Sequence, residues 1–282
     1  MLPTRRDVMR HAVSSGFALA VLPVAPTVLA TDAAGLVAGD VKVPTANGEV
    51  PAYRAAPAKP KAGKAPVLLV VHEIFGVHEH IKDVCRRLAK LGYFAIAPDL
   101  FARHGDATQI ADINELREKI VNKAADAQVA GDLDACVAWS SRQPGADAAH
   151  LGITGFCWGG RITWLYAAHQ PALKAGVAWY GKLTGEREAL RPKFPVDLAS
   201  ELKAPVLGLY GGKDQGIPLE TVEQMKLALA GSKNPVAAKS QFHVYPEAGH
   251  AFAADYRPSY RKVDAEDGFR RLHAWLKQHG VG

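Results

Sequence analysis

Short apolar segments alternate along the chain with longer segments in which apolar residues recur every three or four positions. Continuous apolar runs of four to eight residues are typical of strands that are buried on both faces of a sheet. Such runs predict strands at residues 66–71, 93–97, 151–154, 175–179, 205–210 and 241–245. Alternating apolar and polar residues on both sides of Asn47-Gly48 predict a β-hairpin over residues 41–55.

Helical spacing falls between the predicted strands. It predicts a helix over residues 81–91, a polar helical stretch over 108–142 and a last helix over 259–278. In the last helix, four residues are predicted to face the core: Val263, Phe269, Leu272 and Leu276. Strands that alternate with helices predict an α/β domain with a mostly parallel central sheet, helices on both faces and an N-terminal β-hairpin. In such sheets, functional residues lie at the carboxyl ends of the strands.

The first 30 residues have the features of an export signal rather than of the folded domain. The pair Arg5-Arg6 precedes an apolar stretch over residues 12–29, which ends in small residues at Ala30. A basic segment, an apolar segment and small residues at a cleavage site describe a secretory signal peptide, and paired arginines resemble the bacterial twin-arginine signal. A transmembrane anchor is the alternative, but Pro23 and Pro26 interrupt the apolar stretch.

We therefore predict a signal peptide over residues 1–30, a single catalytic domain over 31–282 and a periplasmic or secreted location. The export machinery is the partner expected for the signal, and no stable membrane anchor is expected after cleavage. The signal carries three of the 34 basic and one of the 28 acidic residues, so the formal charge falls from +6 to +4 without it. The remaining lysines and arginines are scattered, which argues against a nucleic-acid partner. We expect a monomer that acts on a small molecule.

A candidate nucleophile follows the strand predicted to end at Thr154. Residues 155–160 read Gly-Phe-Cys-Trp-Gly-Gly and precede a helical stretch. Small residues on both sides of a nucleophile are typical of the nucleophile elbow, a tight strand-to-helix turn, with Cys157 in the place of the commoner serine. The helix N-terminus can stabilise a thiolate. The alternative is a buried structural cysteine between glycines.

Two partners for Cys157 follow later strands. Asp214 comes just after the strand at 205–210, and His250 comes shortly after the strand at 241–245. Nucleophile, acid and histidine in this order match the chain order of α/β-hydrolases, in which the histidine is the general base and acid and the carboxylate orients it. Taken singly, Asp214 could be a turn residue and His250 an ordinary loop histidine.

Together with this elbow, the motifs His-Glu-Ile-Phe-Gly at 72–76 and Pro-Asp-Leu-Phe-Ala-Arg at 98–103 resemble the dienelactone hydrolase family, the carboxymethylenebutenolidases. The resemblance covers nearly the whole chain after the signal. It implies an α/β-hydrolase fold, hydrolysis of a lactone or carboxylic ester through a thioester, and neither a metal nor an organic cofactor. It assigns the triad to Cys157, Asp214 and His250. It also implies that Glu73 takes the thiol proton and that the backbone amides of Ile74 and Trp158 form the oxyanion hole.

The residues around Glu73 support this role and leave one alternative. Glu73 follows the strand at 66–71, which neighbours the Cys157 strand in an α/β-hydrolase sheet. A carboxylate beside a thiol disfavours ionisation of both groups, so the two are predicted to share one proton. The alternative is that Glu73 caps the following helix. His72 is predicted to be a packed core residue.

The sequence departs from the family pattern at a position that binds the substrate carboxylate. Family members that cleave dienelactone hold its carboxylate with arginines, one of them four residues after the catalytic histidine, where this chain has Ala254. Dienelactone is therefore not the expected substrate. Arg117 and Arg257 are the candidate replacement cations, and Trp179 and Tyr180 are candidate pocket walls.

Two further features leave the function partly open. Cys85 and Cys136 lie on apolar helix faces and are predicted to be buried, which leaves Cys157 as the reactive thiol. A hydrolase is the main hypothesis. The alternative is a periplasmic thiol sensor or ligand-binding protein that has the same fold without turnover. The segment 182–202, which contains Pro192 and Pro195, is a candidate loop over the site.

Overall fold

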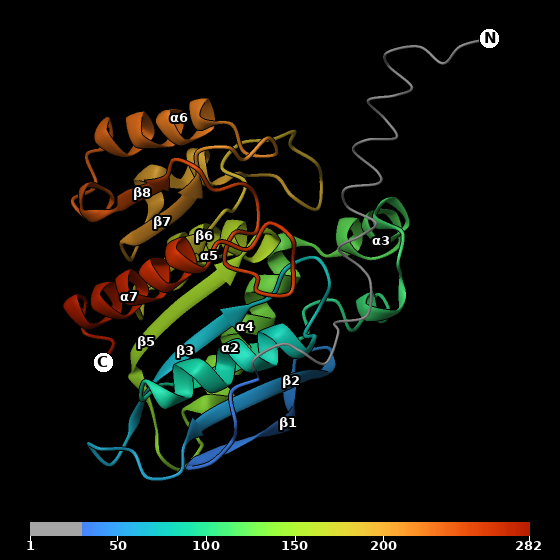
Figure 1. Ribbon diagram of the computed structural model, residues 1–282, viewed down its shortest axis with the longest axis vertical. Helices are drawn as coiled ribbons and strands as arrows, with labels where there is room; N and C mark the ends of the chain where they lie inside the picture. Colours follow the sequence, from blue (N-terminus) through green and yellow to red (C-terminus); the bar gives the residue numbers. More distant parts are fainter. Residues whose placement is uncertain (1–29) are drawn as a thin grey trace.

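The computed structural model describes residues 30–282, which form one eight-stranded sheet with helices around it (Figure 1). The strands are β1 (Leu36–Thr45), β2 (Gly48–Pro57), β3 (Ala65–Val71), β4 (Phe94–Pro98), β5 (Ala146–Phe156), β6 (Leu173–Trp179), β7 (Val206–Gly211) and β8 (Gln241–Tyr245). The α-helices are α2 (Glu79–Lys90), α3 (Ile113–Lys119), α4 (Asp126–Ser140), α5 (Trp158–His169), α6 (Leu219–Ala230) and α7 (Lys262–Gln278). Four short 3₁₀ helices complete the described elements: η2 (Ala107–Gln109), η3 (Val121–Lys123), η4 (Pro195–Glu201) and η5 (Ala237–Lys239).

The sheet has the strand order β1-β2-β4-β3-β5-β6-β7-β8. The hairpin β1–β2 joins the sheet by antiparallel pairing of β2 with β4. All later neighbours are parallel, from β4 through β3, β5, β6 and β7 to β8. The predicted α/β class, the mostly parallel sheet and the N-terminal hairpin are therefore confirmed. Parallel pairing places the ends of β3, β5, β7 and β8 at one edge of the sheet.

Helices cover both faces of this sheet. In Figure 1, α2 and α7 lie in front of the strands, and α4 and α5 lie behind them. The side chains of Val67, Leu68, Leu69, Val70 and Val71 in β3 are all fully buried. This explains why the strand is apolar without alternation, since both of its faces pack against helices.

Several boundaries and one orientation differ from the sequence predictions. Strand β5 begins at Ala146 rather than Leu151, because Ala65 and Pro66 of β3 pair with Ala146 and Asp147 although this part of β5 is partly polar. Helix α7 begins at Lys262, three residues later than predicted. The prediction that Val263 faces the core is wrong, because its side chain is 77% exposed. The buried face of α7 consists of Ala265, Gly268, Leu272, Trp275 and Leu276.

The predicted signal peptide falls on residues 1–30, all but the last of which lie outside the described residues. Within residues 30–282, no helix combines the length and the apolar content that crossing a membrane requires.

Candidate active site

Cys157 lies in a sharp turn between β5 and α5. Its backbone has φ 55° and ψ −113°, an unusual conformation for a residue with a side chain. The turn is possible because its neighbours lack a Cβ atom. A Cβ on Gly155 would lie 2.2 Å from the carbonyl oxygen of Gly159, and one on Gly159 would lie 2.3 Å from the carbonyl oxygen of Val71. The predicted elbow is therefore present, and it presses the start of α5 against the end of β3.

His250 and Asp214 complete a chain of hydrogen bonds with Cys157. The Nε2 atom of His250 lies 3.2 Å from Cys157 Sγ, and its Nδ1–H donates to Asp214 Oδ2 at 2.8 Å. The other oxygen of the Asp214 carboxylate accepts the backbone N–H groups of Gly216 and Ile217 at 2.9 and 3.2 Å, which fixes its orientation. These three side chains follow β5, β7 and β8, as the sequence predicted.

The charge distribution favours an imidazolium at His250. Burial by itself lowers the pKa of His250, but the negative charge on Cys157 and the hydrogen bond to Asp214 outweigh it and raise the pKa to about 10. Below that pH the ring carries two N–H donors, one for each partner. The arrangement therefore sets a positively charged ring beside the Cys157 sulfur, the kind of environment in which a cysteine nucleophile is reactive.

We expect the charged form of the His250 ring to be visible in its titration. By NMR, the His250 ring should titrate near pH 10 and stay protonated at lower pH, since both partners stabilise its charged form. Asp214→Asn and Cys157→Ser should each lower the midpoint, because each removes a negative charge from the ring's surroundings. A midpoint that stays near the ordinary value of 6.5 in the unaltered protein would contradict the predicted imidazolium at His250.

The two amides that the family resemblance assigns to the oxyanion hole have no backbone acceptor among the described residues. Trp158 is the first residue of α5, where an N–H group has no acceptor inside the helix. Within the described part of the chain, the N–H of Ile74 donates no hydrogen bond to another backbone group. His72 fixes the surrounding loop. Its Nδ1–H donates to the Glu73 carbonyl oxygen at 2.6 Å, its Nε2 accepts from Leu100 N–H at 3.1 Å, and its ring stacks on Trp158. This confirms His72 as a packed residue.

Glu73 is 1% exposed and is held by a tyrosine that the sequence analysis did not consider. The hydroxyl of Tyr256 donates to Glu73 Oε2 at 2.6 Å. Burial raises the pKa of Glu73, but Arg257, His80, His78 and this hydrogen bond outweigh it, so the pKa lies below its ordinary value. The second oxygen, Oε1, is buried and has no partner among the described residues. Tyr256 and not Cys157 donates to Glu73 in this conformation, so the predicted sharing of the thiol proton stays a prediction.

Arg257 is connected to Glu73 through Tyr256, whereas Arg117 lies on α3. The Arg257 Nε–H donates to the Tyr256 hydroxyl at 3.1 Å, and its guanidinium lies 4.9 Å from the centre of the Phe75 ring. Arg117 is exposed on α3, and its placement in the substrate pocket stays a prediction. Ala254 is fully buried. The loop after His250 thus supplies a cation, but three residues beyond the position that the resemblance implied.

The two proposed pocket walls have different surroundings. Trp179 is fully buried, stacks on Phe156 and donates its indole N–H to Thr154 Oγ1 at 3.1 Å, so it belongs to the core and not to a pocket wall. Tyr180 is also buried, but its ring meets the His250 ring edge-on at 5.3 Å, and its hydroxyl has no partner among residues 30–282. Tyr180 therefore remains a candidate site residue.

Tyr256 and Arg257 are the functional candidates that the sequence analysis missed or left undecided. The residue before Tyr256, Asp255, accepts a hydrogen bond from His80 Nδ1 at 2.9 Å and forms an ion pair with Arg87. These contacts with α2 hold the loop against the site. The only signal in the sequence was the polar and aromatic composition of the loop after His250. Composition alone does not predict which of the loop's side chains point toward the site.

The remaining predictions concern the other two cysteines and the segment 182–202. Cys85 and Cys136 are buried, and burial raises the pKa of both thiols, in agreement with inert core residues. The segment 182–202 is anchored to the neighbouring helices. Arg161 in α5 donates to the Lys193 carbonyl oxygen at 2.8 Å, and its guanidinium lies 4.8 Å from the centre of the Phe194 ring.

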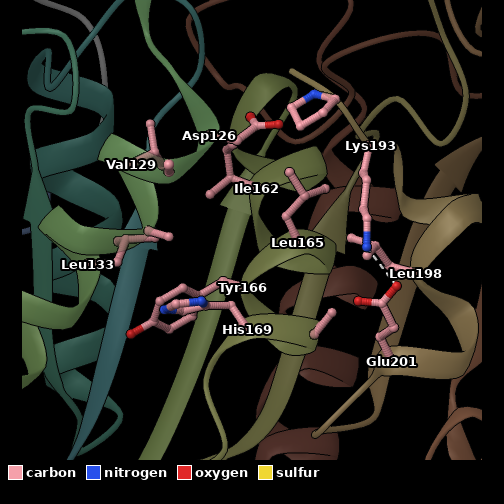
Figure 2. A pocket seen from close by; sticks show the side chains of 14 residues that line it. Asp126, Val129, Leu133, Ile162, Leu165, Tyr166, His169, Lys193, Leu198 and Glu201 are labelled. Carbon is pink, nitrogen blue, oxygen red and sulfur yellow. Dashed lines mark hydrogen bonds and ion pairs between the residues drawn. The ribbon is translucent and has the colours of Figure 1, made fainter. Parts of the chain in front are cut away.

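A cavity of about 380 Å³ lies between α4, α5 and η4 (Figure 2). Its lining includes Val129, Leu133, Ile162 and Leu165, but none of the three hydrogen-bonded residues at Cys157. Lys193 and Glu201 form an ion pair at its edge. The cavity is therefore separate from the candidate active site.

Comparison with known proteins agrees with this architecture. A model of the dienelactone hydrolase family matches residues 50–280. A protein of Methylorubrum extorquens named "Putative carboxymethylenebutenolidase" is 61% identical over 279 residues, which cover 99% of this chain and 94% of that protein. A protein of the same name from Escherichia coli K12 is 55% identical over 272 residues, with 96% and 98% covered.

A solved structure shows the same fold. It is described as "Putative Dienelactone Hydrolase" from Klebsiella pneumoniae and aligns with a TM-score of 0.83 at 54% identity, covering 86% of this chain and 99% of that one. The sheet order and these neighbours define an enzyme with the α/β-hydrolase fold. More specifically, the chain belongs to the dienelactone hydrolase family and is a hydrolase.

Proposed function

We propose that the protein hydrolyses a lactone or carboxylic ester with a triad of Cys157, His250 and Asp214. The observation that carries this proposal is the continuous hydrogen-bonded chain of the three side chains, with 3.2 Å between Cys157 Sγ and His250 Nε2 and 2.8 Å between His250 Nδ1 and Asp214 Oδ2. The names of the related proteins support a lactone or ester as the substrate class. All the proposed catalytic residues come from one chain, so we propose that a monomer is active.

The reaction follows from this geometry in two steps. The Cys157 thiolate attacks the carbonyl carbon, and the amides of Ile74 and Trp158 stabilise the oxyanion that forms. The protonated His250 then gives its proton to the leaving alkoxide, which leaves a thioester on Cys157. In the second step His250 accepts a proton from water, the resulting hydroxide attacks the thioester, and the carboxylic acid product departs. Asp214 orients His250 and stabilises its charged form throughout.

The geometry supports His250 as the acceptor of the thiol proton, because it lies within hydrogen-bonding distance of the sulfur. Glu73 was predicted for that step from the family resemblance. In the present conformation Tyr256 holds one oxygen of Glu73, and the other is free. For Glu73 to serve as a second base, the Cys157 thiol would have to reach this free oxygen.

A screen of purified residues 31–282 against lactones and carboxylic esters tests the proposed activity. We expect hydrolysis of at least one ester class without an added cofactor. The alternative from the sequence is a thiol sensor without turnover. Reversible oxidation of Cys157 together with no hydrolysis across the panel would favour that alternative.

We further propose that residues 1–30 direct export through the twin-arginine route, so that the mature enzyme begins near Thr31 and lies in the periplasm or outside the cell. The support is the Arg5-Arg6 pair followed by the apolar stretch and Ala30. Replacement of both arginines by lysine should retain the protein in the cytoplasm with its first 30 residues attached. Cell fractionation and N-terminal sequencing measure this, and unchanged export of the double variant would contradict the proposed route.

A further inference from the structure

The first residues after the proposed cleavage site lie against α2. The backbone N–H of Thr31 donates to Asp83 Oδ1 at 2.5 Å. Lys90 Nζ donates to Asp32 Oδ1 at 2.9 Å and to the Ala34 carbonyl oxygen at 2.7 Å. Thr31 is half-buried, whereas the four residues that follow it are exposed. The contact with Asp83 is therefore where this segment enters the protein interior.

Asp83, fully buried in α2, shares its cations with other carboxylates. Arg86 Nη2 lies 3.4 Å from its Oδ1, and Arg87 Nε lies 2.5 Å from its Oδ2. Arg86 also donates to Glu79 at 2.6 Å. Arg87 also pairs with Asp255. Three carboxylates thus share two guanidinium groups, and a buried carboxylate with an incomplete share of positive charge favours a further cation.

One oxygen of Asp83 also lacks a hydrogen-bond donor. In the described part of the chain, Oδ2 is buried and accepts no hydrogen bond, although it lies in an ion pair with Arg87. The other basic residues of α2 bond to other carboxylates: His80, Lys82 and Lys90. A buried acceptor without a donor is costly. The position next to Asp83 therefore favours a positively charged group with more than one N–H.

Cleavage after Ala30 would create such a group on Thr31. Hydrolysis of the peptide bond consumes one water molecule and leaves a carboxylate on Ala30 and an ammonium group on Thr31. Before cleavage the Thr31 nitrogen is a neutral amide with one N–H. After cleavage it carries a positive charge and three N–H donors at neutral pH.

We propose that the ammonium group of the mature N-terminus forms an ion pair with Asp83. Asp83 is then the binding site of Thr31 in the processed protein, a role separate from hydrolysis at Cys157. The proposal rests on the cleavage site proposed above. The Thr31 nitrogen already lies 2.5 Å from Oδ1, so the pair needs no movement of α2.

The same ionic contacts reach the loop after His250. Arg87 pairs with Asp83 on one side and with Asp255 on the other. Asp255 directly precedes Tyr256 in that loop. An ammonium group at Asp83 compensates part of its charge, which leaves more of the attraction of Arg87 to Asp255. Processing of the N-terminus therefore stabilises the attachment of this loop to α2.

The reactivity of the new amino group tests the ion pair directly. The protein that begins at Thr31 is treated at neutral pH with an acetylating succinimidyl ester, and mass spectrometry of the N-terminal peptide gives the rate of acetylation. Only the uncharged amine reacts, and a neighbouring carboxylate favours the charged form. We expect Asp83→Asn to accelerate the reaction about tenfold or more. Asp40→Asn, which removes the partner of Lys82 on the same helix, is the matched control and should leave the rate unchanged.

Thermal unfolding measures the effect of the ion pair on stability. The full chain of 282 residues, in which the Thr31 nitrogen is an amide, is compared with the protein that begins at Thr31. We expect the processed form to have a Tm higher by about 3 °C or more, as for a charged hydrogen bond that replaces a neutral one. In Asp83→Asn this difference should largely disappear, whereas in Asp40→Asn it should remain.

The outcomes separate this proposal from those on which the article has relied so far. Equal acetylation rates in the unaltered protein and Asp83→Asn, or a Tm difference that persists in Asp83→Asn, would overturn the ion pair. A mature N-terminus other than Thr31 in cells would overturn the proposed cleavage site and, with it, the natural occupant of Asp83. Neither measurement uses an ester, so failure of the proposed hydrolase function would leave both results unchanged.

Discussion

Replacement of Cys157 by alanine is expected to lower kcat/KM for ester hydrolysis by at least about a thousandfold, because the variant has no atom that can form the thioester. The remaining activity would come from the Ile74 and Trp158 amides and from substrate binding alone. Steady-state kinetics with an activated ester measure the loss. Circular dichroism should show an unchanged fold, since the Cys157 side chain is partly exposed and supports little packing.

A second cysteine provides the control for this prediction. Cys136→Ala removes a thiol that is fully buried in α4, outside the elbow. It should retain the activity and lose only some stability, as expected for a small cavity in the core. Comparable losses of activity in both variants would show that Cys157 acts through the fold and not as the nucleophile.

Gly159→Ala is expected to have the largest effect on the fold of the site. The new methyl group would lie 2.3 Å from the carbonyl oxygen of Val71 and 2.6 Å from that of His72, and neither backbone atom can move without displacing β3. We expect a loss of about 3 kcal/mol or more in the free energy of unfolding. Activity should fall as well, since α5 carries Trp158 and orients Cys157. Urea denaturation and ester kinetics measure the two effects.

Gly131→Ala is the matched substitution. Gly131 lies inside α4 with nothing within 4 Å of the position of a Cβ atom, so alanine adds helix propensity without a clash. It should raise the free energy of unfolding by about 0.5–1 kcal/mol and leave activity unchanged. If Gly159→Ala behaved like Gly131→Ala, the close approach of α5 to β3 would not be a requirement of the elbow.

The hydrogen-bonded arrangement of the proposed triad could be predicted because the positions of its residues follow from the topology. Cys157, Asp214 and His250 each come shortly after an apolar run, and parallel strands bring such positions to one edge of the sheet. The glycines around Cys157 marked the turn, since only residues without a Cβ fit there. These signals are local in the sequence and needed no knowledge of distant contacts.

The position of Arg257 could not be predicted in the same way. Its loop is held by contacts of Asp255 with His80 and Arg87, which lie more than 160 residues earlier in the chain. Arg117 had the right charge, but α3 leaves it exposed. Val263 is apolar, as a core residue should be, but the first turn of α7 directs its side chain to solvent. In each case, tertiary contacts and not the local pattern decided where the side chain lies.

The central claim is that Cys157 carries the acyl group during turnover, and intact-protein mass spectrometry tests it most directly. The protein is mixed with a slowly hydrolysed ester, quenched in acid within the first turnover and digested to locate the modified residue. We predict a mass increase of one acyl group, located on Cys157, that decays as the carboxylic acid product appears and is absent from Cys157→Ala. An acyl group located on another residue, or turnover of the same ester by Cys157→Ala at the original rate, would contradict the account.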